Sequence, residues 1–262
     1  MATNTKFKPE TVLLIPDIHA MPGDKLVRID ALRKFLDGRI LDKLDKIVMI
    51  GDVWDFGSLC NHDKDTPDWN DRSVQEDLNA GFLAVKKVVD IANDFDVATK
   101  DIHFIEGNHE HRYNRWMASD NRLRTSPHPQ TMRDVVKDAY GFNYHSFLQP
   151  AIINKTAFQH YHVSGVMNRP HSGERPALSM LRQHHMSVVQ GHRHTIDWAE
   201  HTRPDGTKIY AFVCGSFVNP QSSFSYAGAA RKMWWSGCHL LHYTAPGEFD
   251  VEMISLVRMC RS

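Results

Sequence analysis

The sequence predicts an α/β protein in which two mixed β-sheets pack as a sandwich flanked by helices. Three observations lead to this prediction. In the first half, short apolar runs alternate with segments of helical apolar spacing, the pattern of parallel strands joined by crossover helices. In the second half, short strands and turn signals predominate. Residues suited to metal binding occur in both halves, so we expect one domain over residues 1–262.

The first half is expected to contain three buried strands with helices between them. The strands are apolar runs at residues 11–16, 46–50 and 102–105. Helical apolar spacing predicts helices at residues 25–36 and 74–95, and further helices are expected at 110–124 and 132–140. Polar residues predict a loop at 56–72, which we expect to govern access to the site together with residues 110–130.

The second half is expected to contain mostly strands. Apolar or alternating runs predict them at residues 144–147, 151–153, 156–162, 187–190, 198–202, 208–214, 238–243 and 251–257. Pro204-Asp205-Gly206 is a hairpin signal between two of these runs. One helix is expected over residues 176–185. This order predicts a second mixed sheet that faces the first.

The composition is that of an ordinary globular protein, with 42% apolar and 24% charged residues. Lys and Arg together number 31, as do Asp and Glu, so affinity for a polyanion has to come from a local patch. The four cysteines form no Cys-x-x-Cys pair, and no apolar run is long enough for a signal peptide or a membrane span. We therefore expect a reduced, cytoplasmic protein without a membrane segment.

Four polar motifs follow apolar runs, where strands are expected to end. In chain order they are Asp17-Ile18-His19, Gly51-Asp52-Val53-Trp54-Asp55, Gly107-Asn108-His109-Glu110 and Gly191-His192-Arg193-His194. Each motif alone could be a turn or a helix cap. Together they offer carboxylate, imidazole and amide ligands, which suit divalent cations such as Mn, Fe, Zn, Co or Ni. A bridging carboxylate can hold two such ions about 3.5–4 Å apart.

In this order the motifs resemble those of the calcineurin-like metallophosphoesterase family, which run Asp-x-His, Gly-Asp-x-x-Asp, Gly-Asn-His-Glu/Asp and Gly-His-x-His. The resemblance covers residues 17–194. It implies the calcineurin-like phosphoesterase fold and hydrolysis of a phosphate ester by a hydroxide that bridges two divalent metal ions. Manganese is the first expectation for these ions, with Fe, Zn, Co or Ni as alternatives.

The resemblance also implies roles for individual residues. The first metal would be held by Asp17, His19 and His194, and Asp52 would bridge. The second metal would be held by Asn108, His192 and one further histidine. His109 would stabilise the transition state and protonate the leaving oxygen. Asp55 is expected to orient a ligand and Glu110 to lie at a helix N-terminus.

The further histidine comes from His160-Tyr161-His162, where the sequence departs from the family's usual His-Gly at a strand end. We select His162, which is nearest the expected strand end and Gly165. His160 lies two residues back on the same strand face and stays the alternative.

For the substrate we expect a phosphate ester, with a preference for a phosphodiester in a nucleotide or nucleic acid. Arg112 and Arg115 follow His109 on an expected helix and could contact phosphates, or could form a solvated helix face. Trp54 could stack on a base or pack in the core. The alternatives are a phosphomonoesterase, a phosphoprotein phosphatase, and an inactive scaffold. We disfavour the scaffold because every motif residue is chemically competent.

Overall fold

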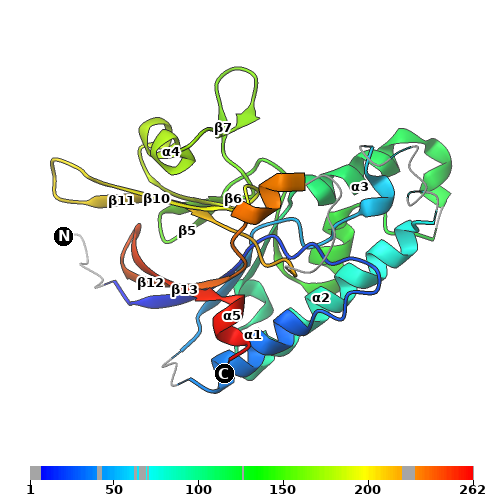
Figure 1. The fold of residues 1–262 in the computed structure, drawn as a ribbon, viewed down its shortest axis with the longest axis horizontal. Coiled ribbons are helices and arrows are strands. Elements are labelled where there is room, and N and C mark those ends of the chain that lie inside the picture. The colour runs from blue at the N-terminus through cyan, green and yellow to red at the C-terminus, as the bar shows by residue number, and fades with distance from the viewer. Residues whose placement is uncertain are drawn as a thin grey trace, which may run out of the picture.

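The computed structural model describes residues 7–39, 43–61, 64, 69, 71–125, 127–219 and 228–261. Within them the chain forms two mixed β-sheets, a two-stranded ribbon and several helices (Figure 1). The predicted α/β class with two mixed sheets is therefore confirmed. None of the helices in these ranges combines the length and the apolar character that a bilayer crossing needs.

The first sheet has six strands in the order β13-β12-β1-β2-β3-β4. Its strands are β1 (Glu10–Ile15), β2 (Lys46–Met49), β3 (Ile102–Ile105), β4 (Asn143–His145), β12 (Gly237–Ala245) and β13 (Glu248–Ser255). Strands β1 to β4 pair in parallel, whereas β12 and β13 add antiparallel pairs beside β1.

The second sheet has five strands in the order β10-β11-β9-β6-β5. Its strands are β5 (Ala151–Ile153), β6 (Thr156–Gln159), β9 (Ser187–Gln190), β10 (Ile196–Thr202) and β11 (Lys208–Cys214). Strand β9 pairs in parallel with β6 and β11, and the edge strands β5 and β10 are antiparallel to their neighbours. The ribbon consists of β7 (Val163–Ser164) and β8 (Arg169–Pro170).

Five α-helices are described: α1 (Val27–Asp37), α2 (Val74–Asp94), α3 (Asn108–Ser119), α4 (Pro176–His184) and α5 (Leu256–Met259). Shorter helical segments are η1 (Gly57–Leu59), η3 (Thr99–Asp101), η4 (Asn121–Thr125), η5 (Asp134–Asp138) and η6 (Gly228–Met233). Several predicted boundaries shift by a few residues, and two of these shifts concern the candidate site. Helix α3 already begins at Asn108, and β6 stops at Gln159, before the two histidines that follow it.

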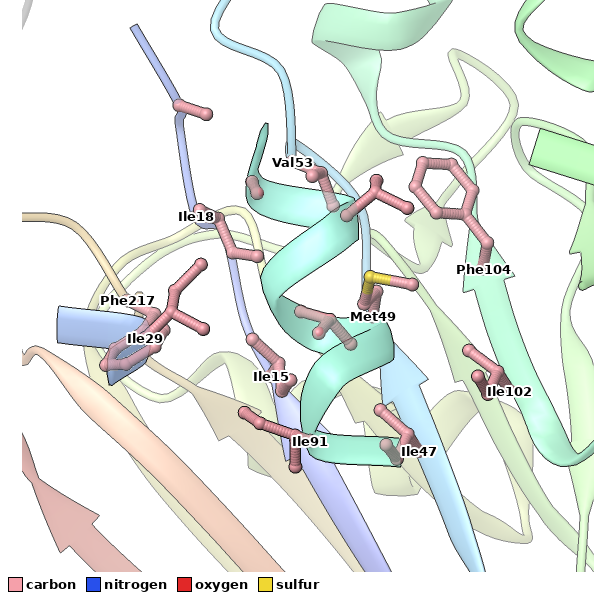
Figure 2. Close-up of a cluster of buried hydrophobic side chains, with 14 of the residues drawn as sticks. Ile15, Ile18, Ile29, Ile47, Met49, Val53, Ile91, Ile102, Phe104 and Phe217 are labelled. Carbon is pink, nitrogen blue, oxygen red and sulfur yellow. The ribbon is translucent and has the colours of Figure 1, made fainter. Parts of the chain in front are cut away.

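Successive side chains along a strand point to opposite faces of the sheet, so each strand contributes to two apolar clusters. In β1, Leu13 and Ile15 belong to the cluster that α1 and α2 complete, whereas Val12 and Leu14 belong to the cluster shared with the second sheet. Figure 2 shows Ile15 and Ile47 beside the helix that carries Ile91. Helix α4 covers the outer face of the second sheet. The layers are thus α1 and α2, first sheet, second sheet, and α4 (Figure 1).

This layering brings distant segments of the chain together. The parallel strands β1, β2 and β3 have their carboxyl ends at one edge of the first sheet. The parallel strands β6 and β9 have theirs at one edge of the second. Carboxyl ends of parallel strands are the usual place for functional loops. All four polar motifs follow such ends.

Candidate metal centre

Several motif residues have a backbone conformation that L-amino acids rarely adopt. Their φ angles are 21° for Asp17, 46° for His19, 49° for Asp52, 66° for His192 and 57° for His194. Each such conformation costs of order 1–3 kcal/mol, and strained residues of this kind gather at functional sites. The strain lies where the chain leaves β1, β2 and β9, and the affected side chains converge.

Asp17, His19 and His194 form a first group of donor atoms. All three are buried, and one ligand atom from each lies within 4.8 Å of the others. His194 Nε2 is 3.0 Å from Asp17 Oδ2 and 3.2 Å from His19 Nε2. His19 Nδ1 lies 2.9 Å from Asp55 Oδ1, to which it donates because an ionised carboxylate can only accept. In the neutral ring, His19 Nε2 therefore has only a lone pair facing this group.

Asp52, His160 and His192 form a second group, again with ligand atoms within 4.8 Å of one another. His160 Nδ1 donates to the Ile50 carbonyl oxygen at 2.9 Å. Its Nε2 faces two oxygens, Asn108 Oδ1 at 2.9 Å and Asp52 Oδ2 at 3.2 Å. A metal-binding histidine typically has one ring nitrogen fixed by a backbone carbonyl, while the other faces oxygen atoms that can bind the same metal ion.

The electrostatic environment of this second group favours a positive charge. Burial opposes the charge on His160, but the Asp52 carboxylate outweighs it and raises the pKa of His160 to about 9. Burial would also raise the pKa of Asp52, yet the rings of His160 and His109 hold it well below its usual range. A positive charge, carried by a proton or by a metal ion, is therefore stabilised between Asp52 and His160.

Asp52 lies between the two groups. Its Oδ2 is 3.2 Å from His160 Nε2, 3.7 Å from His19 Nε2 and 3.8 Å from His109 Nε2. One carboxylate oxygen thus faces imidazoles from both sheets. This is the location that a ligand shared by two cations requires.

The structure brings His160 to the second group and not His162, against the prediction. Strand β6 ends at Gln159 and the chain bends at His160 and Tyr161, so the alternation that would align the two histidines is broken. His162 is instead packed under the second sheet. Its Nε2 donates to the Val189 carbonyl oxygen at 3.2 Å, and burial lowers its pKa to about 3.

Glycines allow the motifs to approach this closely. A Cβ at Gly107 would lie 2.2 Å from Asp52 Oδ1, and one at Gly191 would lie 2.2 Å from Asp17 Oδ1. Both distances are well below van der Waals contact, so no other residue fits without displacing a carboxylate. The glycine in each motif is therefore required by the donor atom opposite it.

Glu110 lies in the first turn of α3, as expected, and has a further role that the sequence interpretation missed. It is fully buried, and its carboxylate accepts from the backbone N–H groups of Asp52, Trp54 and Gly107 at 2.9–3.0 Å. Burial and the nearby Asp52 raise the pKa of Glu110 to about 7. Glu110 thus ties the loop after β2 to the start of α3. A Glu three residues after the residue that precedes a helix is one half of the capping-box signal, and Gly107 has no side chain to supply the other half.

His109 lies at the edge of the cluster. Its Nδ1 donates to the Asp55 carbonyl oxygen, which leaves Nε2 on the side of Asp52. Burial lowers the pKa of His109 to about 4, with the neighbouring His19 acting in the same direction. His192, in the second group, also has its pKa lowered by burial and by His160, to about 3. Both rings are therefore neutral at pH 7.

The three residues predicted to contact substrate lie in different environments. Trp54 is fully buried and its Nε1 donates to the Leu78 carbonyl oxygen at 3.1 Å, so it packs in the core and cannot stack on a base. Arg112 and Arg115 both line a cleft beside Asn108. Arg112 Nη1 also donates to the Phe56 carbonyl oxygen at 3.2 Å.

The donor set fits divalent cations. Its ligand atoms are imidazole nitrogens, carboxylate oxygens and an amide oxygen, all buried or half-buried and directed at one another. In the described part of the chain, neither Asp17 Oδ1 nor His194 Nδ1 has a hydrogen-bond partner, although both atoms are buried. Neither the models of known protein families nor the curated proteins give a match to this sequence. Functional inference therefore rests on the motifs and this geometry.

Proposed function

We propose that the protein is a metal-dependent phosphoesterase with a calcineurin-like fold, and that it hydrolyses a phosphate ester with two divalent cations. The main support is the convergence of buried acceptor atoms on two neighbouring points that share Asp52 Oδ2. In an ordinary core histidine, the ring N–H faces a hydrogen-bond acceptor and the ring lone pair faces a donor. Here lone pairs and carboxylate oxygens face one another, which is favourable only when a positive charge lies between them.

In this proposal, Asp17, His19 and His194 hold one cation and Asn108, His160 and His192 the other, with Asp52 between them. Bound there, the cations would supply a strong nucleophile from water at neutral pH and neutralise charge on the phosphate oxygens. Manganese is the first expectation for their identity, with Fe, Zn, Co or Ni as alternatives. Asp55 orients His19 through the hydrogen bond to its Nδ1.

His109 is the proposed proton donor to the leaving oxygen: its neutral ring would take up a proton at Nε2 when the anionic ester binds and would pass that proton to the leaving oxygen. The Asp55 carbonyl accepts from its Nδ1 and so fixes the ring with Nε2 on the side of Asp52, where the ester would react. No other imidazole of the cluster is left for this role, because each of the others is assigned to a cation. General acid catalysis by a positioned histidine contributes about 10²–10⁴-fold to a rate.

Hydrolysis of an aryl phosphodiester with added Mn²⁺ tests the proposal. We expect turnover by the wild-type chain and a loss of about 10²–10⁴-fold in His109→Ala, with unchanged metal content by elemental analysis. Turnover of aryl phosphomonoesters alone would favour the phosphomonoesterase alternative. Metal binding without turnover of any ester over a panel of metals would contradict the proposal and favour an inactive scaffold.

A further inference from the structure

A cleft of about 850 Å³ opens beside the candidate metal centre. One of its walls is a single face of α3, formed by Asn108, His111, Arg112, Arg115, Trp116 and Ser119. Each of these positions lies three or four residues from another of them, the spacing that aligns side chains along one face of a helix. From Asn108 to Ser119 the face is about 16 Å long. This face is therefore several times longer than the roughly 3.4 Å of duplex axis per phosphate of one strand.

The charged side chains that line this cleft are all positive among the described residues. Arg72, Arg112 and Arg115 line it, whereas the described lining residues include no Asp or Glu. The whole chain has as many acidic as basic residues, so the excess of cations here is local. A guanidinium group pairs with a phosphate through two parallel N–H bonds. The cleft thus favours a ligand with phosphates at several points, away from the reacting one.

Aromatic rings line the same cleft. Phe147 stacks on His111 with ring centroids 4.4 Å apart, and both rings are only half-buried. Tyr161 lies 4.8 Å from the His192 ring, next to the metal centre. Trp116 lies further along α3. Exposed rings beside arginines are the combination that binds the bases and backbone of single-stranded nucleic acid.

The wall that carries these rings is held in place by a buried carboxylate. Glu106 accepts from His111 Nδ1 at 3.1 Å, from Asn114 Nδ2 at 2.7 Å and from the Phe147 backbone N–H at 3.1 Å. Glu106 is itself almost fully buried. The stacked pair of His111 and Phe147 is therefore fixed before any ligand arrives, which lowers the entropic cost of binding.

We propose that this cleft binds a single strand of nucleic acid, with its phosphates on Arg72, Arg112 and Arg115 and its bases on the aromatic rings. The inference rests on the proposed function, because it makes a phosphodiester of that strand the substrate of the metal centre. A peptide with a single phosphate would present it to the metals and would leave the arginines along α3 without a phosphate to pair with. A duplex would keep its bases stacked inside and away from the rings.

Binding of a short, fluorescently labelled oligonucleotide tests this inference. The measurement uses metal-loaded full chain carrying His109→Ala, so that cleavage is suppressed, with single-stranded DNA and single-stranded RNA as separate arms. We expect Arg115→Ala in this background to weaken binding about five- to tenfold. The slope of log affinity against log salt should fall by about 0.7, the value for one phosphate contact to a single strand. Arg182→Ala, an exposed arginine on α4 outside the cleft, should change neither quantity.

Stacking is tested with an oligonucleotide of equal charge that lacks bases. We expect it to bind at least about fivefold more weakly than the normal strand, because each base–ring contact carries part of the affinity. Equal binding of the abasic strand, tighter binding of duplex or of a phosphoserine peptide, or equal effects of Arg115→Ala and Arg182→Ala would overturn the inference. If the wild-type chain hydrolyses the aryl phosphodiester in these cases, the proposed function stands alone. If the oligonucleotide binds and no ester is hydrolysed, strand binding by the cleft stands, whereas the proposed function and the role of the strand as substrate fail.

Discussion

At the scale of single residues, the orientation of one ring decides which histidine belongs to the candidate metal centre. The Ile50 carbonyl fixes His160 with Nε2 toward Asp52 and Asn108, whereas His162 uses its Nε2 to bond Val189. The sequence contains both histidines two positions apart and gives no sign of where β6 ends. The choice between them therefore depends on a bend that only the folded chain reveals.

We predict that His160→Ala removes at least one metal ion per chain because it deletes a donor atom of the second group. His162→Ala should keep the metal content and lower only the free energy of unfolding, since its ring is buried away from the cluster. Elemental analysis of the two variants after loading with Mn²⁺ checks this. Loss of metal in His162→Ala alone would reverse the assignment.

A second prediction at this scale concerns His239, a buried histidine outside the candidate metal centre. It is fully buried on β12, its Nε2 donates to the Cys214 carbonyl at 2.7 Å, and burial lowers its pKa from 6.5 to about 4. Between these two values the unfolded chain binds a proton that the folded chain does not. Stability should therefore fall as the pH falls from 6.5 to 4, by roughly 3 kcal/mol from this group.

Urea unfolding of wild type and His239→Gln across this pH range isolates the contribution. The glutamine can still donate to Cys214 but does not titrate, so the loss of stability on acidification should be smaller than in wild type. His201→Gln, at an exposed histidine of β10, is the control and should follow the wild-type curve. Parallel curves for wild type and His239→Gln would show that His239 does not titrate as described.

At the scale of elements, α2 lies unusually close to the loop after β2. A Cβ at Gly81 would lie 1.8 Å from Trp54 Nε1, so the indole ring occupies the space that any larger residue on α2 would need. This packing explains why Trp54 is core and not a platform for a base. The sequence pattern places Trp54 in a metal-binding motif but does not indicate which helix covers it.

We predict that Gly81→Ala destabilises the protein by about 1–3 kcal/mol through overpacking against Trp54. At an open helix position the same change would stabilise by roughly 1 kcal/mol, so the sign itself is informative. Asn79→Ala, exposed on the same helix, should stay within about 0.5 kcal/mol of wild type. Denaturant midpoints measure all three chains, and a stabilised Gly81→Ala would contradict the packing.

The sequence predicted most strands and helices because their apolar spacing reports which side faces a core. It was least accurate where local pattern and long-range contact differ. Strand β6 is shorter than the range of 156–162 predicted for it, and α3 begins at Asn108 because Glu110 accepts from the N–H of Gly107 at the helix start. The candidate ligands that directly follow strand ends were placed together as expected. A parallel strand fixes where its next residues lie, and this holds for Asp17, Asp52 and Asn108.

At the scale of the whole molecule, the candidate metal centre lies where both sheets end and has candidate ligands from each. Asp17, Asp52 and Asn108 follow strands of the first sheet, whereas His160 and His192 follow strands of the second. Cations bound there would link the two layers as the apolar cluster between them does. Removal of metal should therefore weaken the whole fold and not one loop.

We predict that saturating Mn²⁺ raises the melting temperature by several degrees over the chelator-treated chain. At one hundred times the dissociation constant, binding adds about 2.7 kcal/mol to the free energy of unfolding. For a chain of this size, each 1 kcal/mol is worth about 2–4 °C. Asp52→Asn should show a much smaller rise in the same thermal scan. An equal rise in both chains would show that the stabilising metal binds somewhere other than this site.

The number of bound metal ions per chain, before and after Asp52→Asn, is the most direct test. Because Asp52 Oδ2 faces donors of both groups, we expect two divalent ions per wild-type chain by elemental analysis and a loss of at least one in the variant. An unchanged metal content in Asp52→Asn, or a wild-type chain that takes up no divalent ion, would contradict the shared dinuclear centre on which the proposed chemistry depends.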